Sequence, residues 1–151
     1  MKETAVRLMN SAMVLQGTKE SYSTLDFAQI DLYDGQAEIL KVGASASFIK
    51  RGDDVRAISS ETLPAGFDIN QELSSVKKHL QDGDFLVMVT DGVLEYLHTN
   101  EPEDRLSEII SEIKTDNAGG LARSILESVL KCTGGYAIDD MTVLATGIWE
   151  K

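Results

Sequence analysis

The sequence predicts an α+β fold, built from antiparallel strands with helices packed against them. Runs rich in β-forming residues, joined by short turns, occupy much of the first half of the chain. Two amphipathic helices follow, and a further apolar strand comes after them. Antiparallel hairpins followed by a helix pair and a returning strand are typical of layered α+β domains. No repeat, low-complexity tract or linker-like stretch marks a domain boundary.

The first predicted element is a helix over residues 3–16. Apolar residues recur there at helical spacing, in a window without Pro or Gly. They are Ala5, Leu8, Met9, Ala12 and Leu15, with Val6, Met13 and Val14 on the other side. So wide an apolar stripe predicts a helix that packs between two neighbours rather than facing water.

Two β-hairpins are predicted next. Their strands are residues 23–32 with 37–42, and residues 45–51 with 55–59. Asp34-Gly35 and Gly52-Asp53 provide the turn signals between these strands. Lys50, Arg51 and Arg56 cluster around the second hairpin and could meet an anionic partner, although solvated charges at strand ends are the simpler interpretation.

Residues 60–80 contain a loop and then a short element. Pro64 and Gly66 break regular structure in residues 60–70, which predicts a loop. The apolar spacing in residues 71–80 leaves both a strand and a short helix open. A strand is favoured because residues 81–84 could close a hairpin onto the apolar run that follows.

Helices dominate the last third of the chain. Residues 93–98 could form one or two helical turns, and Asn100 with Glu103 resembles a capping pair around Pro102. The helix that follows has its apolar face at Leu106, Ile109, Ile110 and Ile113.

Asp116 or Asn117 can cap a second helix. Its expected apolar face is Ala122, Ile125, Leu126, Val129 and Leu130. Cys132 at its end is interpreted as a small buried residue. Residues 141–149 form the last predicted strand.

Composition excludes several classes of function. A formal net charge of -11 repels nucleic acid and anionic lipid surfaces. The only cysteine, Cys132, excludes an internal disulfide and a thiolate-cluster metal site, and it is compatible with a reducing cytoplasm. No apolar run approaches the roughly 20 residues needed to span a bilayer. A soluble cytoplasmic segment is therefore expected, and a longer parent protein could be anchored to a membrane by other segments.

Two acidic strand ends are the candidate site. An apolar run from Phe85 ends abruptly at Asp91-Gly92, and Asp139-Asp140 directly precedes the last strand. If these two strands are antiparallel neighbours, Asp91 and Asp139 lie at the same edge of the sheet. On the first segment alone, an ordinary Asp-Gly turn after a core strand is the simpler interpretation.

Like charges held close together favour a bound cation, and carboxylate oxygens suit Mg2+ or Mn2+ better than zinc. His79 and His98 lack ligand spacing and are not expected to bind metal. A cation held in this way can lower the pKa of bound water and bind a phosphoryl oxygen. The pattern therefore indicates hydrolysis without a protein nucleophile.

These motifs carry a family resemblance. Residues 83–93 and 139–143 resemble the last two acidic motifs of the PPM-type metal-dependent serine/threonine phosphatases. Further segments are similar to the phosphatase domains of the stage II sporulation protein E family: residues 22–26, 40–43, 47–52 and 63–66. The resemblance covers nearly the whole chain.

The resemblance implies a layered α-β-β-α sandwich with two Mn2+ or Mg2+ ions. Its implied substrate is a phosphoserine on an anti-anti-sigma factor, in the control of sporulation sigma-factor activation. At the matching positions Asp91 and Asp139 would be metal ligands, while Gly92 and Asp140 would lie near the site.

One family motif is missing. Relatives carry an earlier metal-bridging Asp within an Asp-Gly-x-Gly segment, and residues 34–37 lack the second Gly. Residues 1–151 are therefore expected to be the C-terminal portion of a single phosphatase domain, inactive or nearly so by itself. Exposed sheet edges would then favour self-association.

Two other functions were weighed against the phosphatase. A non-catalytic domain of the same fold could bind a phosphoprotein or a partner subunit, with the acids serving as loop caps. A haloacid-dehalogenase-type phosphatase needs a nucleophilic Asp two residues before Asp91, where Val89 stands, and this largely excludes it.

Overall fold

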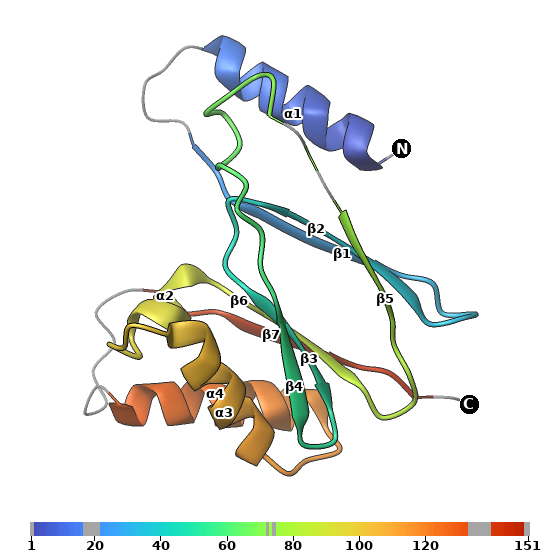
Figure 1. Cartoon of the computed structure of the whole chain (residues 1–151), viewed down its shortest axis with the longest axis vertical. Coiled ribbons are helices and arrows are strands. Elements are labelled where there is room, and N and C mark those ends of the chain that lie inside the picture. The colour runs from blue at the N-terminus through green and yellow to red at the C-terminus, as the bar shows by residue number, and fades with distance from the viewer. Residues whose placement is uncertain (1, 17–21, 72, 74, 133–139, 150–151) are drawn as a thin grey trace. The chain divides into compact units, whose positions relative to one another are not determined.

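The computed structural model describes residues 2–16, 22–71, 73, 75–132 and 140–149 (Figure 1). The chain divides into two compact units that alternate along the sequence. Unit 1 is formed by residues 1–44 and 60–79, and unit 2 by residues 45–59 and 80–151. Each unit contains one antiparallel sheet and at least one helix, which confirms the predicted α+β class.

Unit 1 is a three-stranded sheet with one helix. Its elements are α1 (Lys2–Gln16), β1 (Leu25–Ile30), β2 (Gln36–Val42) and β5 (Ser75–His79). The strand order is β1-β2-β5, and both pairs are antiparallel. A core of Val6, Leu40, Val42 and Ala65 joins the helix to β2 and to the loop before β5.

The buried side of α1 differs from the predicted stripe. Val6 and Asn10 are buried, whereas Leu8 and Leu15 are 68% and 77% exposed. The helix therefore packs through one narrow side only, and the expected packing between two neighbours is wrong for the described residues. The buried side also includes a polar residue, Asn10, which the apolar pattern could not reveal.

Asn10 attaches α1 to the loop of residues 60–70. Its side-chain amide donates to the backbone oxygen of Asp68 (2.8 Å), and its Oδ1 accepts from the backbone N–H of Gly66 (2.8 Å). Asn10 is only 3% exposed, so water cannot readily replace either partner. A residue of both donor and acceptor character is therefore required at this position.

Asn10→Asp is expected to destabilise the chain by about 2 kcal/mol, because a carboxylate oxygen would then face the Asp68 carbonyl in a buried position. Urea unfolding followed by circular dichroism measures the change. Asn70→Asp is the matched control, since Asn70 is exposed and contributes its backbone N–H to a local turn. Equal effects at the two positions would contradict the role given to Asn10.

The strand prediction for residues 71–80 is confirmed, but its predicted partner is wrong. β5 pairs with β2, with Val76 opposite Ile39, and not with the apolar run that follows it. Residues 81–84 do form a turn, in which the Asp84 N–H donates to the Gln81 oxygen (3.0 Å). The turn leads the chain from one unit to the other instead of closing a hairpin.

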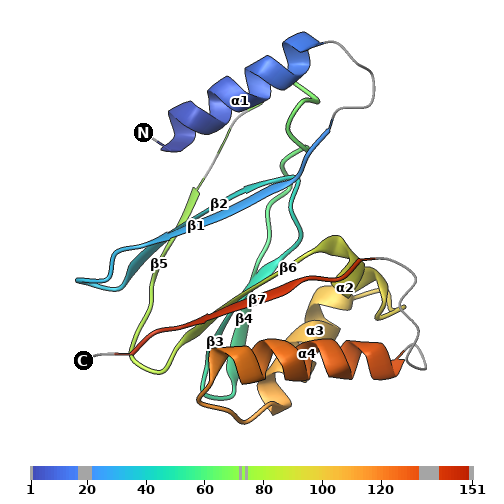
Figure 2. The same ribbon diagram turned by 180° about the vertical axis from the view of Figure 1, so that it is seen from behind.

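Unit 2 is a four-stranded sheet with three helices. Its elements are β3 (Ser47–Arg51), β4 (Asp54–Ile58), β6 (Phe85–Val89), α2 (Asp91–Glu95), α3 (Pro102–Glu112), α4 (Ala118–Cys132) and β7 (Val143–Gly147). The strand order is β4-β3-β6-β7, and all three pairs are antiparallel. Figure 2 shows α3 and α4 lying against this sheet, where α3 contacts β4 and α4 contacts β7.

The core of unit 2 is formed by β6 and the two long helices. Phe48 and Val87 from the sheet meet Leu106, Ile110 and Ile125 from α3 and α4. β6 is almost fully buried along its length, as its unbroken apolar run predicts. The strand that leads to Asp91 is therefore a rigid part of the core.

The helix caps agree only in part with the sequence pattern. Asn117 caps α4, since its Oδ1 accepts from the Gly120 N–H (3.0 Å). The expected pair of Asn100 and Glu103 is wrong: α3 begins after Glu101 without a side-chain cap, and Glu103 accepts from the Ser59 hydroxyl (2.7 Å). A tertiary contact has replaced the local one.

Lys50 and Cys132 in unit 2 have surroundings opposite to those expected, whereas Arg51 is exposed as expected and also pairs with a buried acid. Lys50 is 4% exposed and donates to the backbone oxygens of Gly52 and Ser111, so it is not a solvated charge. Burial lowers the pKa of its ammonium group. Arg51 binds Asp84, a carboxylate with no exposed surface. Cys132, predicted to be buried, is exposed at the end of α4.

Candidate functional site

Asp91 lies where β6 leaves the sheet. It is the first residue of α2, two positions after Val89 ends the strand. Val89 pairs with Val143 at the start of β7, so the two strands are antiparallel neighbours, which is the condition on which the candidate site depends. Residues 140–142, which precede β7, therefore run beside residues 90–92. Asp139 itself lies outside the described residues.

Two backbone contacts hold residues 90–92 beside residues 140–142. The Thr90 N–H donates to the Thr142 oxygen (3.1 Å), which extends the pairing of the strands by one step. The Gly92 backbone lies so close to Asp140 that an added Cβ would be 2.4 Å from the Asp140 backbone oxygen. Since real Cβ atoms essentially never approach an atom so closely, this position requires glycine.

Gly92→Ala is expected to destabilise the chain by about 1–3 kcal/mol, because the added methyl group must displace backbone rather than a flexible side chain. Thermal unfolding measures the stability, and the amide chemical shifts of Met141 and Thr142 report the local displacement.

Gly119→Ala is the control for Gly92→Ala. Gly119 lies in α4, and the new Cβ would meet only Asn117 Oδ1 at 3.4 Å. Alanine there should leave stability unchanged or raise it, because it favours the helix more than glycine does. If Gly92→Ala were as stable as the wild type, and the amide chemical shifts of Met141 and Thr142 did not change, the close approach to Asp140 would be contradicted.

The acidic side chains of these two segments are accessible to solvent. Asp91 and Asp140 are both exposed, and Asp91 Oδ1 accepts from the Gly92 N–H (3.0 Å). Exposed carboxylate oxygens on rigid backbone fit a hard divalent cation in chemical type. Among the described residues, which do not include Asp139, no three His, Cys, Asp or Glu side chains are grouped to hold a metal ion.

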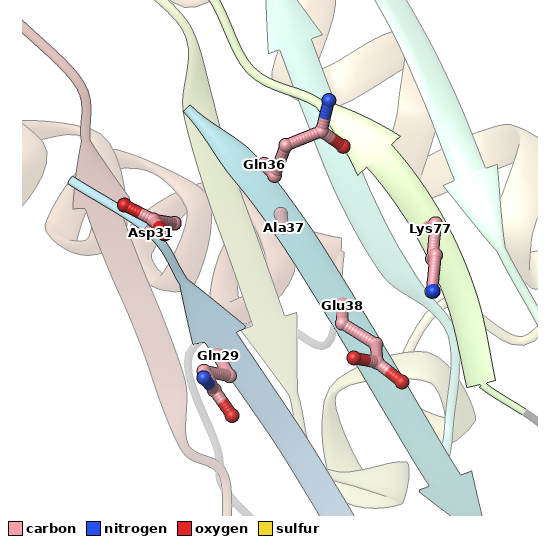
Figure 3. Close-up of a pocket in the computed structure, with 6 residues that line it drawn as sticks. All are labelled: Gln29, Asp31, Gln36, Ala37, Glu38 and Lys77. Atoms are coloured by element: carbon pink, nitrogen blue, oxygen red, sulfur yellow. The ribbon is translucent and has the colours of Figure 1, made fainter. Parts of the chain in front are cut away.

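Two surface hollows are lined by other residues than these acids. One is on the sheet of unit 1, where Gln29, Glu38 and Lys77 form a polar row across the three strands (Figure 3). The other lies between α3 and α4 and includes Arg105 and Cys132. Neither hollow contains Asp91 or Asp140, so neither of them is the candidate site.

Sequence reasoning named Gly92 but gave no role to Thr90. The hydroxyl oxygen of Thr90 accepts from the Thr142 N–H (2.9 Å). The contact depends on the strand register, because Val89 opposite Val143 places Thr90 opposite Thr142. The sequence alone does not give this register.

No helix among the described residues is both long and apolar enough to cross a lipid bilayer.

Sequence comparison places nearly all of the chain in one family. The sequence model of stage II sporulation protein E matches residues 2–148. Stage II sporulation protein E of Bacillus subtilis (strain 168) is 35% identical over 148 residues, which is 97% of this chain and 18% of that protein. The protein of the same name from Priestia megaterium is 38% identical over 141 residues, 93% of this chain and 24% of that protein. The chain thus spans less than a quarter of the length of each relative.

Solved structures agree with this assignment. The phosphatase domain of the cell fate determinant SpoIIE from Bacillus subtilis, presoaked with Mn, is 34% identical with a TM-score of 0.79, covering 100% of this chain and 67% of that chain. The PP2C phosphatase domain of SpoIIE with a fragment of its regulatory domain is 37% identical with a TM-score of 0.86, covering 94% and 43%.

PppA from Pseudomonas aeruginosa, at 22% identity and a TM-score of 0.70 over 94% of this chain and 66% of that chain, shares the fold. The mixed α+β architecture with antiparallel sheets therefore matches the PP2C phosphatase domains, as predicted. With a family match over residues 2–148, this chain belongs to the stage II sporulation protein E family.

Proposed function

We propose that this chain is the C-terminal portion of a PPM-type phosphatase domain, and that the complete protein hydrolyses phosphoserine in a protein substrate. The observation that carries the proposal is the pairing of β6 with β7. It brings Asp91 beside the segment that begins at Asp140, at one edge of one sheet. The relatives, whose solved structures are phosphatase domains, support the same activity.

Asp91 and Asp139 would hold Mn2+ or Mg2+, with two ions in the complete domain. Such a cation supplies Lewis acidity, which lowers the pKa of bound water and polarises a phosphoryl oxygen. Gly92 lets the two backbone segments approach closely, and Asp140 shapes the site beside them. The chain's own contribution is thus to hold carboxylates in place on a rigid strand end.

The proposed substrate is a phosphorylated anti-anti-sigma factor, in the control of sporulation sigma-factor activation. The support for it is membership of the family. A net charge of -11 would oppose the approach of a phosphorylated protein, so cations at the acidic edge would also be needed for binding. We place the domain in the cytoplasm, with any membrane anchor outside residues 1–151.

A non-catalytic domain that binds a phosphoprotein is the second candidate function. The hydrogen bond that Asp91 Oδ1 accepts from the Gly92 N–H (3.0 Å) favours it, because a local loop-stabilising role explains that contact without a cation. In that case Asp91 and Asp140 would stabilise their loops, and phosphate release would not depend on them.

Phosphate release from a phosphoserine protein separates the two functions. We expect the complete protein to release phosphate with Mn2+ or Mg2+ and to stop when a chelator is added. We expect the 151-residue chain to be inactive or nearly so and to self-associate in sedimentation experiments. Binding of the phosphoprotein without any cation-dependent release by the complete protein would favour the binding domain and contradict the phosphatase.

A further inference from the structure

The pairing of β6 with β7 ends in an unusual way. In an antiparallel ladder, hydrogen-bonded residue pairs exchange two bonds, each residue donating its N–H to the carbonyl oxygen of the other. At the opposite end of this pairing the Ile148 N–H donates to the Asp84 oxygen (2.9 Å), and the Ile148 oxygen accepts from the Gly83 N–H (2.9 Å) instead of from Asp84. Thr90 and Thr142 occupy the equivalent position beyond the last pair, Val89 and Val143.

Only half of this exchange is made by the backbone. The Thr90 N–H donates to the Thr142 oxygen (3.1 Å). The Thr142 N–H donates instead to the Thr90 hydroxyl oxygen (2.9 Å). The Thr90 carbonyl oxygen accepts from the Val93 N–H (3.0 Å) and so forms the first turn of α2. The hydroxyl therefore takes the place that the carbonyl would have in a continued ladder.

This use of the hydroxyl departs from the usual role of threonine before a helix. A threonine at the N-cap normally accepts from an N–H in the first helical turn. Thr90 has the extended backbone of an N-cap, with φ -82° and ψ 160°, yet its side chain makes no capping bond. Its hydroxyl is used across the strands, so the chain can turn into α2 at Asp91 while Thr142 stays bound.

We propose that Thr90 is a positioning residue, whose hydroxyl holds residues 140–142 beside Asp91 and thereby sets the separation of Asp91 and Asp140. This inference rests on the proposed function. The Gly92 backbone limits the approach of Asp140 from one side, and the Thr90 hydroxyl prevents the same segment from moving away.

The chemistry of the contact defines the substitutions that test it. Serine keeps the accepting oxygen, whereas valine keeps the shape of threonine without an acceptor. Thr90 and Thr142 are both exposed, so water can satisfy the Thr142 N–H when the hydroxyl is lost. Thr90→Val should therefore fold, and its main effect should be on position rather than on stability.

Amide hydrogen exchange in the 151-residue chain tests the contact directly. We expect Thr90→Val to accelerate exchange of the Thr142 amide about tenfold or more, because its bond to the hydroxyl is lost. Thr90→Ser should behave as wild type. Thr146→Val is the matched control, since Thr146 is an exposed threonine on β7 opposite Leu86. Wild-type exchange in Thr90→Val, or accelerated exchange in Thr90→Ser, would overturn the proposal.

Mn2+ affinity of the complete protein, measured by electron paramagnetic resonance, tests the consequence for the acids. Thr90→Val should weaken it about 10-fold to 100-fold, with Thr90→Ser and Thr146→Val unchanged. Faster Thr142 exchange with unchanged Mn2+ affinity would overturn the positioning role. If the wild-type protein bound no Mn2+, the proposed phosphatase would fail, and Thr142 exchange alone would then decide whether the hydroxyl holds the segment.

Discussion

Asp91→Asn is expected to lower the phosphatase activity of the complete protein about a thousandfold. The amide cannot replace a carboxylate as an anionic ligand, so several kcal/mol of cation-derived stabilisation of the transition state should be lost. Initial rates of phosphate release from a phosphoserine protein, measured across Mn2+ concentrations, give the size of the effect. Asp139→Asn should have a similar effect, and Asp140→Asn a smaller one.

The control for Asp91→Asn is Asp116→Asn, which makes the same change of charge at an exposed position between α3 and α4. It should leave activity at the wild-type level. Circular dichroism should show that both variants fold, since Asp91 is exposed and accepts from the neighbouring Gly92 N–H. Substantial activity in both Asp91→Asn and Asp139→Asn would remove the site assignment.

Asp84→Asn is expected to reduce the free energy of unfolding of the chain by about 3 kcal/mol. Asp84 has no exposed surface, and its two carboxylate oxygens accept from Arg51 Nε (2.8 Å), Arg51 Nη2 (2.7 Å) and the Gln81 N–H (2.8 Å). In asparagine one oxygen becomes an NH2 group, which must face a donor in a position closed to water. Urea unfolding with intrinsic fluorescence measures the loss.

Asp54→Asn provides a close comparison, because Asp54 lies on the hairpin that carries Arg51. Asp54 also binds an arginine, Arg56, but the two side chains are 57% and 77% exposed. An exposed ion pair contributes less than about 1 kcal/mol, so this variant should unfold almost as wild type does. If the two substitutions cost the same, burial would not be what makes the Arg51–Asp84 pair important.

Short-range patterns predicted most of the secondary structure. Gly35 and Gly52 adopt positive φ in the turns of the two predicted hairpins, where the sequence signal and the geometric need coincide. Leu106, Ile109 and Ile110 are buried on the predicted face of α3, because helical spacing and core contact agree there. The strand ending before Asp91 was predicted for the same reason, since an unbroken apolar run requires burial.

Partners distant in sequence were harder to predict. The turn at residues 81–84 is compatible with a hairpin, but the local sequence does not state which strand lies alongside, and β5 joins β2 instead. Lys50 was expected in solvent, since its buried acceptors, the Gly52 and Ser111 oxygens, are backbone atoms that no side-chain pattern reveals.

The sequence indicated part of the candidate site and missed one of its contacts. The apolar runs predicted the two strands, but their antiparallel pairing was only a condition of the site, and the structure supplies it. The role of Thr90 could not be predicted. Its hydroxyl accepts the Thr142 N–H in place of its carbonyl oxygen, and this contact depends on which residues of the two strands lie opposite each other. The assignment of Asp91 and Asp139 as metal ligands stays a prediction, with Asp139 outside the described residues.

A ribosome releases this chain in order, so the two sheets are completed at different moments of synthesis. The three strands of unit 1 have all emerged once His79 is free, whereas β6 gains its second neighbour only when β7 follows α4. Until then the nascent polypeptide carries an apolar strand with one open edge. Chaperones that bind such edges are therefore expected to engage the growing chain between the emergence of β6 and that of β7.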